Sequence, residues 1–118
     1  MSETLSPCER IGKKKDFVFI YKRGRRYRGK YFTLIYLSND LSFSRVAVVA
    51  SKKIGNAVKR NKIKRRLRAL FRRNKHLLGS PLDLVFISRK EMQAATWPDL
   101  QSDFLAAVNA VGRRRQPV

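Results

Sequence analysis

A basic segment from Ser51 to Leu78 constrains the fold of this chain more than any other stretch of its sequence. When successive side chains are turned by about 100°, as in an α-helix, its apolar residues align at i, i+4, i+7 and i+8. These residues are Ile63, Leu67, Leu70 and Phe71. The pattern predicts a helix from about residue 57 that packs one narrow apolar stripe against a sheet.

Cationic side chains predominate on both sides of that stripe. In helical projection one flank carries Asn61, Lys64, Arg65, Arg68 and Arg72, and the other carries Lys59, Lys62, Arg66 and Arg73. No acidic residue occurs between Asp40 and Asp83, so like charges repel along the helix without compensation. Because a solvated face normally mixes charges of both signs, we expect this helix to bind a polyanion.

The overall charge supports the same expectation. The 118 residues suit one domain with one modest core, and 28 Lys and Arg against 8 Asp and Glu give a formal charge of +20. Residues 10–30 and 52–75 hold 22 of the 28 basic residues. Nucleic acid is the favoured partner. A membrane surface is the rival, but the basic segment lacks the Trp-rich face of an interfacial helix.

Several other classes are disfavoured. No run approaches the roughly 18 apolar residues that span a bilayer, and residues 1–10 do not read as a secretion signal, so a cytoplasmic location is expected. Cys8 is the only cysteine, which excludes an intramolecular disulfide. His76, the only histidine, is expected on the surface near a helix C-terminus rather than as a catalytic partner of Cys8.

A second, shorter helix is predicted over residues 13–23. Phe17, Ile20 and Tyr21 lie on one face of it, and Gly24 is expected to end it in the left-handed conformation. Two interpretations of the aromatic residues remain open: they belong to the core, or they are exposed for stacking on bases.

Four strands are predicted around these helices. Residues 25–37 read as two strands joined by a turn at Gly29, and residues 83–89 read as a buried strand. Residues 45–50 are apolar on both sides, and we therefore expect them to form a central strand of the sheet.

Turn and capping residues delimit the helices. Gly55 and Asn56 are expected to supply a sharp turn and an N-cap before the basic helix, and Gly79 to Pro81 end the segment after it. Thr96 is expected to cap a last helix that ends at Gly112. Its apolar face, with Trp97 beside it in the core, comprises Leu100, Phe104, Leu105, Val108 and Val111.

The predicted architecture is a single α+β domain with the order α-β-β-β-α-β-α, a sandwich of a four-stranded sheet and three helices. Residues 1–12 are expected to be a flexible lead-in, residues 13–112 the folded domain, and residues 113–118 a mobile basic tail.

The segment from residue 51 to residue 68 also resembles a known family. It reads Ser-Lys-Lys-Ile-Gly-Asn-Ala-Val-Lys-Arg-Asn-Lys-Ile-Lys-Arg-Arg-Leu-Arg, similar to the Arg-Asn-Arg-type helix of the protein subunit of bacterial ribonuclease P. Weaker similarity covers residues 10–111, through Asp16-Phe17, Gly24, the paired strands and the strand led by Asp83. The resemblance implies a left-handed crossover between the two strands that flank the basic helix, an exception to the usual handedness.

The resemblance further implies a function. A large catalytic RNA removes the 5′ leader of precursor tRNA, and this chain, which is not expected to be catalytic alone, binds that RNA and the leader. Two Mg²⁺ ions would be bound mainly by the RNA, and no obligatory protein partner is evident. The implied RNA-binding residues are Lys52, Lys53, Arg60, Asn61, Lys64, Arg65 and Arg68.

Helical projection independently supports the last four of these residues, which share one flank. Arg60 projects in line with the apolar stripe, where its guanidinium would hold a phosphate or cap a backbone carbonyl. By resemblance the leader occupies a cleft between the first helix and the sheet, formed by Phe17, Tyr21 and Ile35, the last standing where the family often has an aromatic residue.

Two alternative functions are weighed against this one. A ribosomal protein would explain the charge and size but not the pattern of residues 51–68. A nuclease active on its own would need paired carboxylates or a histidine cluster. The candidate carboxylates occur singly along the sequence: Asp16, Asp40, Asp83, Glu91, Asp99 and Asp103.

Overall fold

The alternation of helical and strand patterns along the sequence is reproduced in the computed structural model, which describes residues 9–114. Its helices are α1 (Lys14–Arg23), α2 (Ala57–Asn74) and α3 (Trp97–Arg114), and its strands are β1 (Arg25–Arg28), β2 (Phe32–Ser38), β3 (Arg45–Val49) and β4 (Leu82–Ser88). The α-β-β-β-α-β-α order and the α+β class are therefore confirmed. The handedness of the β3–α2–β4 crossover stays a prediction.

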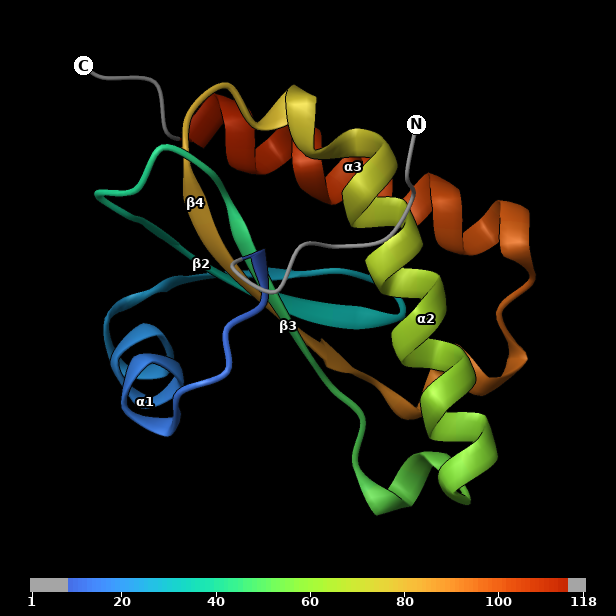
Figure 1. Ribbon diagram of the computed structural model, residues 1–118. Helices are drawn as coiled ribbons and strands as arrows, with labels where there is room; N and C mark the ends of the chain where they lie inside the picture. Colours follow the sequence, from blue (N-terminus) through green and yellow to red (C-terminus); the bar gives the residue numbers. More distant parts are fainter. Residues whose placement is uncertain (1–8, 115–118) are drawn as a thin grey trace.

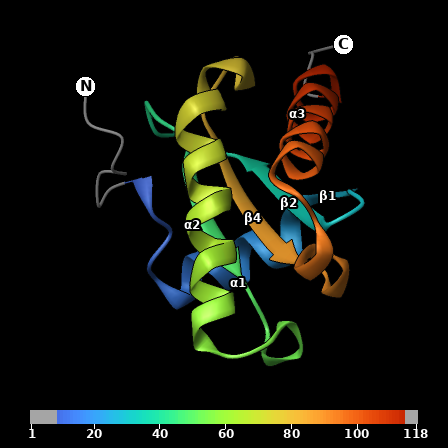
Figure 2. The same ribbon diagram turned by 90° about the vertical axis from the view of Figure 1, so that its right-hand side faces the viewer.

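One mixed sheet lies between the helices, with the strand order β1-β2-β4-β3. β2 pairs antiparallel with β1 and β4, and β3 runs parallel to β4. Helices α2 and α3 cover one face and α1 covers part of the other (Figure 1). Figure 2 shows α2 and α3 next to each other in front of the sheet, with α1 behind it.

The alternation of side chains along the strands divides the core between the two faces. Phe32, Leu34 and Tyr36 of β2 contribute to the larger core beneath α2 and α3. Ile35 of β2 and Val85 of β4 form a smaller core with Ile20 of α1. Because both faces of β2 and β4 are covered, their sequences are apolar on both sides.

Helix α2 begins where its capping residues predict. The backbone turns at Gly55, whose φ of 145° favours glycine, and the Asn56 side chain accepts a hydrogen bond from the Lys59 N–H at 3.0 Å. All four residues of the predicted stripe are buried: Ile63, Leu67, Leu70 and Phe71. The interpretation of this helix as amphipathic is confirmed.

Helix α3 is capped as expected but ends later. The Thr96 hydroxyl accepts a hydrogen bond from the Asp99 N–H at 3.2 Å, and Leu100, Phe104, Val108 and Val111 are buried. Leu105, predicted on the same face, is 39% exposed. The prediction that Gly112 ends the helix is wrong, since α3 continues to Arg114.

Two further expectations are corrected by the structure. β3 lies at an edge of the sheet, and it is apolar on both sides because the two cores cover both of its faces. Gly24 is extended, with φ −70° and ψ 157°. A Cβ atom there would lie 2.6 Å from Ile35 Cγ2 and 2.7 Å from the Ile20 carbonyl oxygen. Glycine is therefore needed for close packing between α1 and β2, not for a left-handed turn.

Part of the expected flexible lead-in contacts the fold. Glu9 is buried and pairs with Lys75 at 2.5 Å, and the Ile11 N–H donates to the Val46 carbonyl at 3.0 Å along the edge of β3. Residues 1–8 and 115–118 lie outside the described residues. None of the helices in residues 9–114 is both long and apolar enough to cross a bilayer.

Candidate nucleic-acid interface

The cationic flank of α2 remains accessible in the folded chain. Asn61 and Arg65 are exposed, and Lys64 and Arg68 are half-buried beside the apolar stripe. Within residues 9–114 none of these four side chains forms an ion pair with an acidic residue. Four groups predicted from one helical projection thus lie together on one flank.

Several acidic residues are engaged elsewhere in the fold. Asp103 accepts hydrogen bonds from the backbone N–H groups of Lys30 and Tyr31, at 3.1 and 3.0 Å. Glu9 pairs with Lys75, and Glu91 lies 3.7 Å from Arg89. No acidic residue occurs on α2 itself. An anion that binds this flank would therefore meet no carboxylate from the helix.

Arg10 adds a cation that the sequence pattern did not identify. It is exposed and forms an isolated bridge with Val46 of β3, which places the N-terminal segment beside α2. Partial burial, together with the nearby charge of Arg10, lowers the pKa of Arg68 below its ordinary value. The positive charges of Arg10 and Arg68 therefore disfavour each other on this flank. Only tertiary structure brings them together, so the helical pattern gave no signal for Arg10.

The other predicted RNA-binding residues surround the start of α2. Lys52 and Lys53 are exposed on a short 3₁₀ turn, Lys52–Ile54, before the helix. Arg60 is half-buried, and its Nε is buried without a hydrogen-bond partner within the described part of the chain. No backbone carbonyl among the described residues accepts a hydrogen bond from the Arg60 guanidinium, so the alternative in which it caps a carbonyl is not observed.

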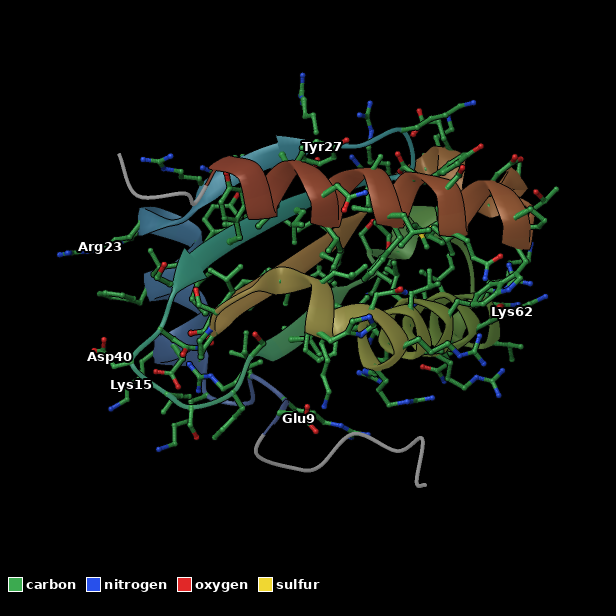
Figure 3. The ribbon with its side chains drawn as sticks, turned by 90° about the horizontal axis from the view of Figure 1, so that it is seen from above. Glu9, Lys15, Arg23, Tyr27, Asp40 and Lys62 are labelled. Atoms are coloured by element: carbon green, nitrogen blue, oxygen red, sulfur yellow. The ribbon has the colours of Figure 1, made fainter. Side chains whose placement is uncertain are left out.

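The opposite flank of α2 has a different neighbour. The guanidinium of Arg66 lies 5.9 Å from the centroid of the Trp97 ring at the start of α3. Lys62, also on this flank, is exposed. Figure 3 places Lys62 and Arg23 of α1 at opposite ends of the molecule. The two flanks thus differ in that one adjoins α3 and the other adjoins Arg10.

The predicted leader-binding residues of α1 are partly accessible. Phe17 is half-buried and Tyr21 is 47% exposed. Their rings are nearly parallel, with centroids 6.4 Å apart and an interplanar angle of 18°. Ile35 differs from expectation because it is fully buried in the smaller core with Ile20. It therefore offers no accessible surface for stacking, since its position on β2 faces the underside of α1.

An ionic cluster ties α1 to the sheet. Asp83 of β4 accepts hydrogen bonds from Arg45 Nε at 2.9 Å, from Arg45 Nη2 at 2.7 Å and from Asn39 at 2.8 Å. Asp16 of α1 lies 3.5 Å from the same guanidinium. The hydrogen bond to Asp83, which outweighs partial burial, raises the pKa of Arg45 above its ordinary value. This cluster helps to fix the position of Phe17, the residue after Asp16.

A hollow of about 720 Å³ adjoins Tyr21 at the C-terminal end of α1. It is lined by Tyr21, Arg26, Tyr27, Arg28, Thr33 and Ile87. Arg26 and Arg28 were given no role from the sequence, although their alternation along β1 would have placed them on one face. Among the described residues, no three His, Cys, Asp or Glu side chains form a group that could hold a metal ion.

Comparisons with known proteins agree with this geometry. The family model for ribonuclease P matches residues 5–112. A ribonuclease P protein component from Syntrophus aciditrophicus is 41% identical over 97 residues, which cover 82% of each chain. The solved ribonuclease P protein of Thermotoga maritima superposes with a TM-score of 0.79 at 31% identity, covering 86% of this chain and 96% of that one.

A second solved structure belongs to a Staphylococcus aureus ribonuclease P protein, a mutant described as having defective mRNA degradation activity. It superposes with a TM-score of 0.80 at 33% identity and covers 90% of this chain and 89% of its own. The match over nearly the whole folded region, together with the cationic flank of α2 that the fold leaves accessible, shows that this chain belongs to the ribonuclease P protein family.

Proposed function

We propose that this chain binds the catalytic RNA of ribonuclease P through α2 and the 5′ leader of precursor tRNA through α1, and so assists removal of the leader. The catalytic centre lies on the RNA, which also binds most of the Mg²⁺. The chain acts by binding and orienting the substrate, and not by supplying a catalytic group.

The accessible cationic flank of α2 carries this proposal. Asn61, Lys64, Arg65 and Arg68 project from a helix whose apolar stripe is anchored in the core, so they hold a fixed spacing along about two turns. Arginine can contact a phosphate with two N–H donors, whereas the Asn61 amide both donates and accepts. A rigid row of such groups suits the backbone of a structured RNA.

Lys52, Lys53 and Arg60 extend this surface around the start of α2. Lys52 and Lys53 are exposed, and lysine acts toward phosphate as a flexible point charge. Arg60 lies close to the core and keeps a buried Nε that has no partner among the described residues. An RNA phosphate beside the helix would be expected to interact with the outer part of its guanidinium.

Phe17 and Tyr21 are the groups we propose for the leader. Each presents part of an aromatic ring to solvent beside the sheet. Stacking on an aromatic ring contributes about 1 to 3 kcal/mol per base and discriminates poorly between bases. Weak selectivity for leader sequence is therefore expected. Ile35 is not included because it is fully buried.

Reconstitution with the cognate RNA tests the proposal. Precursor tRNA is incubated at low Mg²⁺ with the RNA alone, with the chain alone and with both. Stimulation by the chain of cleavage at the leader junction is expected, and no stimulation would refute the assignment. Phe17→Ala should weaken the use of leader-bearing substrate and leave the binding of mature tRNA nearly unchanged.

The arm with the chain alone tests a second candidate function. The Staphylococcus aureus relative is described through a mutant with defective mRNA degradation activity, so RNA cleavage by this chain is a specific alternative. An unstructured RNA added to the same arm reports it directly. Cleavage of this RNA by the chain alone would favour that alternative under two conditions. The activity must co-purify with the chain, and it must be lost when a residue of the chain is replaced.

A further inference from the structure

The hollow at the end of α1 lies on the sheet face that α1 covers only in part. Arg28 of β1 pairs with Thr33 of β2, and Thr33 pairs with Ile87 of β4. These three residues therefore form one row across three strands on the same face. Thr33 and Ile87 are half-buried, so the floor of the hollow is sheet surface next to α1.

Strand β1 brings two cations to this hollow. Arg26 pairs with Ile35 and Arg28 with Thr33, which places both arginines on the face that carries α1. Arg25, paired with Tyr36, lies on the opposite face. Arg28 is exposed and forms no ion pair with any described residue. Because side chains alternate along β1, Arg26 and Arg28 face the hollow and Arg25 faces away from it.

Arg26 is held against Tyr21. Its Nη2 donates a hydrogen bond to the Tyr21 carbonyl oxygen at 3.1 Å, and its guanidinium lies 4.9 Å from the centroid of the Tyr21 ring. The Tyr21 ring in turn lies 6.4 Å from the Phe17 ring. Aromatic rings and guanidinium groups therefore follow one another from the middle of α1 to β1.

Such an arrangement is typical of surfaces that bind single-stranded nucleic acid. Bases stack on the aromatic rings, and cations alongside contact the backbone phosphates. Duplex RNA hides its base faces within the helix, so a groove of this kind suits unpaired nucleotides. The positive charge of Arg26 and Arg28 matches a polyanion and disfavours an apolar or a cationic partner.

We propose that the hollow is a second subsite for the single-stranded leader, in which Arg26 and Arg28 contact phosphates of nucleotides beyond those that stack on Phe17 and Tyr21. The inference rests on the proposed binding of the leader by α1. The contribution of Arg26 and Arg28 to the use of precursor tRNA should therefore depend on leader length, because a short leader ends before it reaches β1.

The test uses the holoenzyme reconstituted from the full chain and its cognate RNA. The ratio kcat/KM is measured for precursor tRNA with a leader of about two nucleotides and with one of about ten, which lies within the roughly 4 to 16 nucleotides that single-strand-binding folds cover. Replacing both arginines, as Arg26→Gln with Arg28→Gln, should lower kcat/KM roughly three- to tenfold for the long leader only.

Three further variants make the result specific. Arg25→Gln removes the same charge from the other face and should leave both substrates unchanged. Arg28→Gln alone should give a smaller loss of kcat/KM for the long leader, without disturbing the interaction between Arg26 and Tyr21. Arg26→Lys keeps the positive charge and should therefore retain part of the contribution of Arg26 to kcat/KM for the long leader. For the long leader, the slope of log K against log salt should become shallower by about 0.7 for each arginine–phosphate interaction removed.

Phe17→Ala separates failure of this inference from failure of the proposed function. If Phe17→Ala reduces use of the long leader but the double variant behaves like Arg25→Gln, the second subsite is refuted and leader binding by α1 stands. If neither the double variant nor Phe17→Ala has a leader-dependent effect, the second subsite and leader binding by α1 are both refuted. A loss of equal size for the short and long leaders would likewise overturn the second subsite.

Discussion

Exchanging one cation on each flank of α2 tests which side of the helix docks on RNA. Arg65→Gln removes a charge from the flank proposed to bind RNA, and Lys62→Gln removes one from the flank that adjoins α3. Both side chains are exposed, and both changes lower the formal charge from +20 to +19 (20 − 1). Glutamine has a helix propensity close to those of arginine and lysine, so neither change should unfold α2.

The expected difference follows from counterion release. Removal of one phosphate interaction should reduce the slope of log K against log salt by about 0.7 to 0.9. Raising the salt from about 50 to 200 mM should therefore lower the affinity of the parent chain roughly threefold more than that of Arg65→Gln. At fixed moderate salt an exposed ionic interaction contributes about 1 kcal/mol, which corresponds to about fivefold in affinity. Lys62→Gln should change neither quantity measurably.

The assay is equilibrium binding of the chain to ribonuclease P RNA across a salt series. Circular dichroism of each variant checks that helix content is retained. If Lys62→Gln changes the salt slope as much as Arg65→Gln does, binding depends on total charge rather than on one flank, and the orientation proposed for α2 is wrong. A larger effect of Lys62→Gln would place the RNA on the side of α3.

Three predictions concern the fold that supports these surfaces, each measured as the free energy of urea unfolding in one buffer. Asp83→Asn should destabilise the fold by about 2 to 3 kcal/mol. This is less than the roughly 3 to 5 kcal/mol for breaking a fully buried ion pair, because Arg45 stays 20% exposed. A destabilisation below about 1 kcal/mol would contradict this reasoning. Leu67→Ala should cost about 2 to 5 kcal/mol because Leu67 is fully buried, and a near-neutral result would mean that α2 is not anchored by its stripe. Gly24→Ala should cost about 1 to 3 kcal/mol through its clash with Ile35, whereas an unchanged stability would show that α1 can shift to admit a methyl group.

Local patterns in the sequence predicted the parts of the fold that depend on local physics. The stripe from Ile63 to Phe71 predicted both the existence of α2 and its buried side, because a helix fixes which side chains share a face. Asn56 and Thr96 cap the helices that they were expected to cap, since a cap needs only a few neighbouring residues.

Expectations that depended on tertiary arrangement were less accurate. β3 was expected in the centre of the sheet because it is apolar on both sides, but coverage of both faces by helices and connecting segments produces the same pattern at an edge. Gly24 was assigned a left-handed conformation, whereas its role is to admit the side chain of Ile35. Neither the strand order nor this close approach is encoded in the spacing of nearby residues.

The same limit applies to the candidate interface. The α2 flank could be derived from helical projection, but Arg10 joins it only through pairing with Val46 of β3. Arg26 and Arg28 join Tyr21 only because β1 returns beside the end of α1. The alternation along β1 could have placed Arg26 and Arg28 on one face from the sequence, but their position beside Tyr21, and that of Arg10 beside α2, follow only from the folded sheet.

A comparison of charge repulsion with apolar burial explains how α2 can remain helical without any acidic residue. Its like-charge pairs at i,i+4 are Arg60–Lys64, Lys62–Arg66, Lys64–Arg68 and Arg68–Arg72. Each costs roughly 0.2 to 0.5 kcal/mol, or about 1 to 2 kcal/mol together. Burial of the four stripe residues contributes about 1.5 to 3 kcal/mol each as an upper bound. The stripe outweighs the repulsion several-fold, so the helix needs no carboxylates of its own, and its positive charge remains available to an external polyanion.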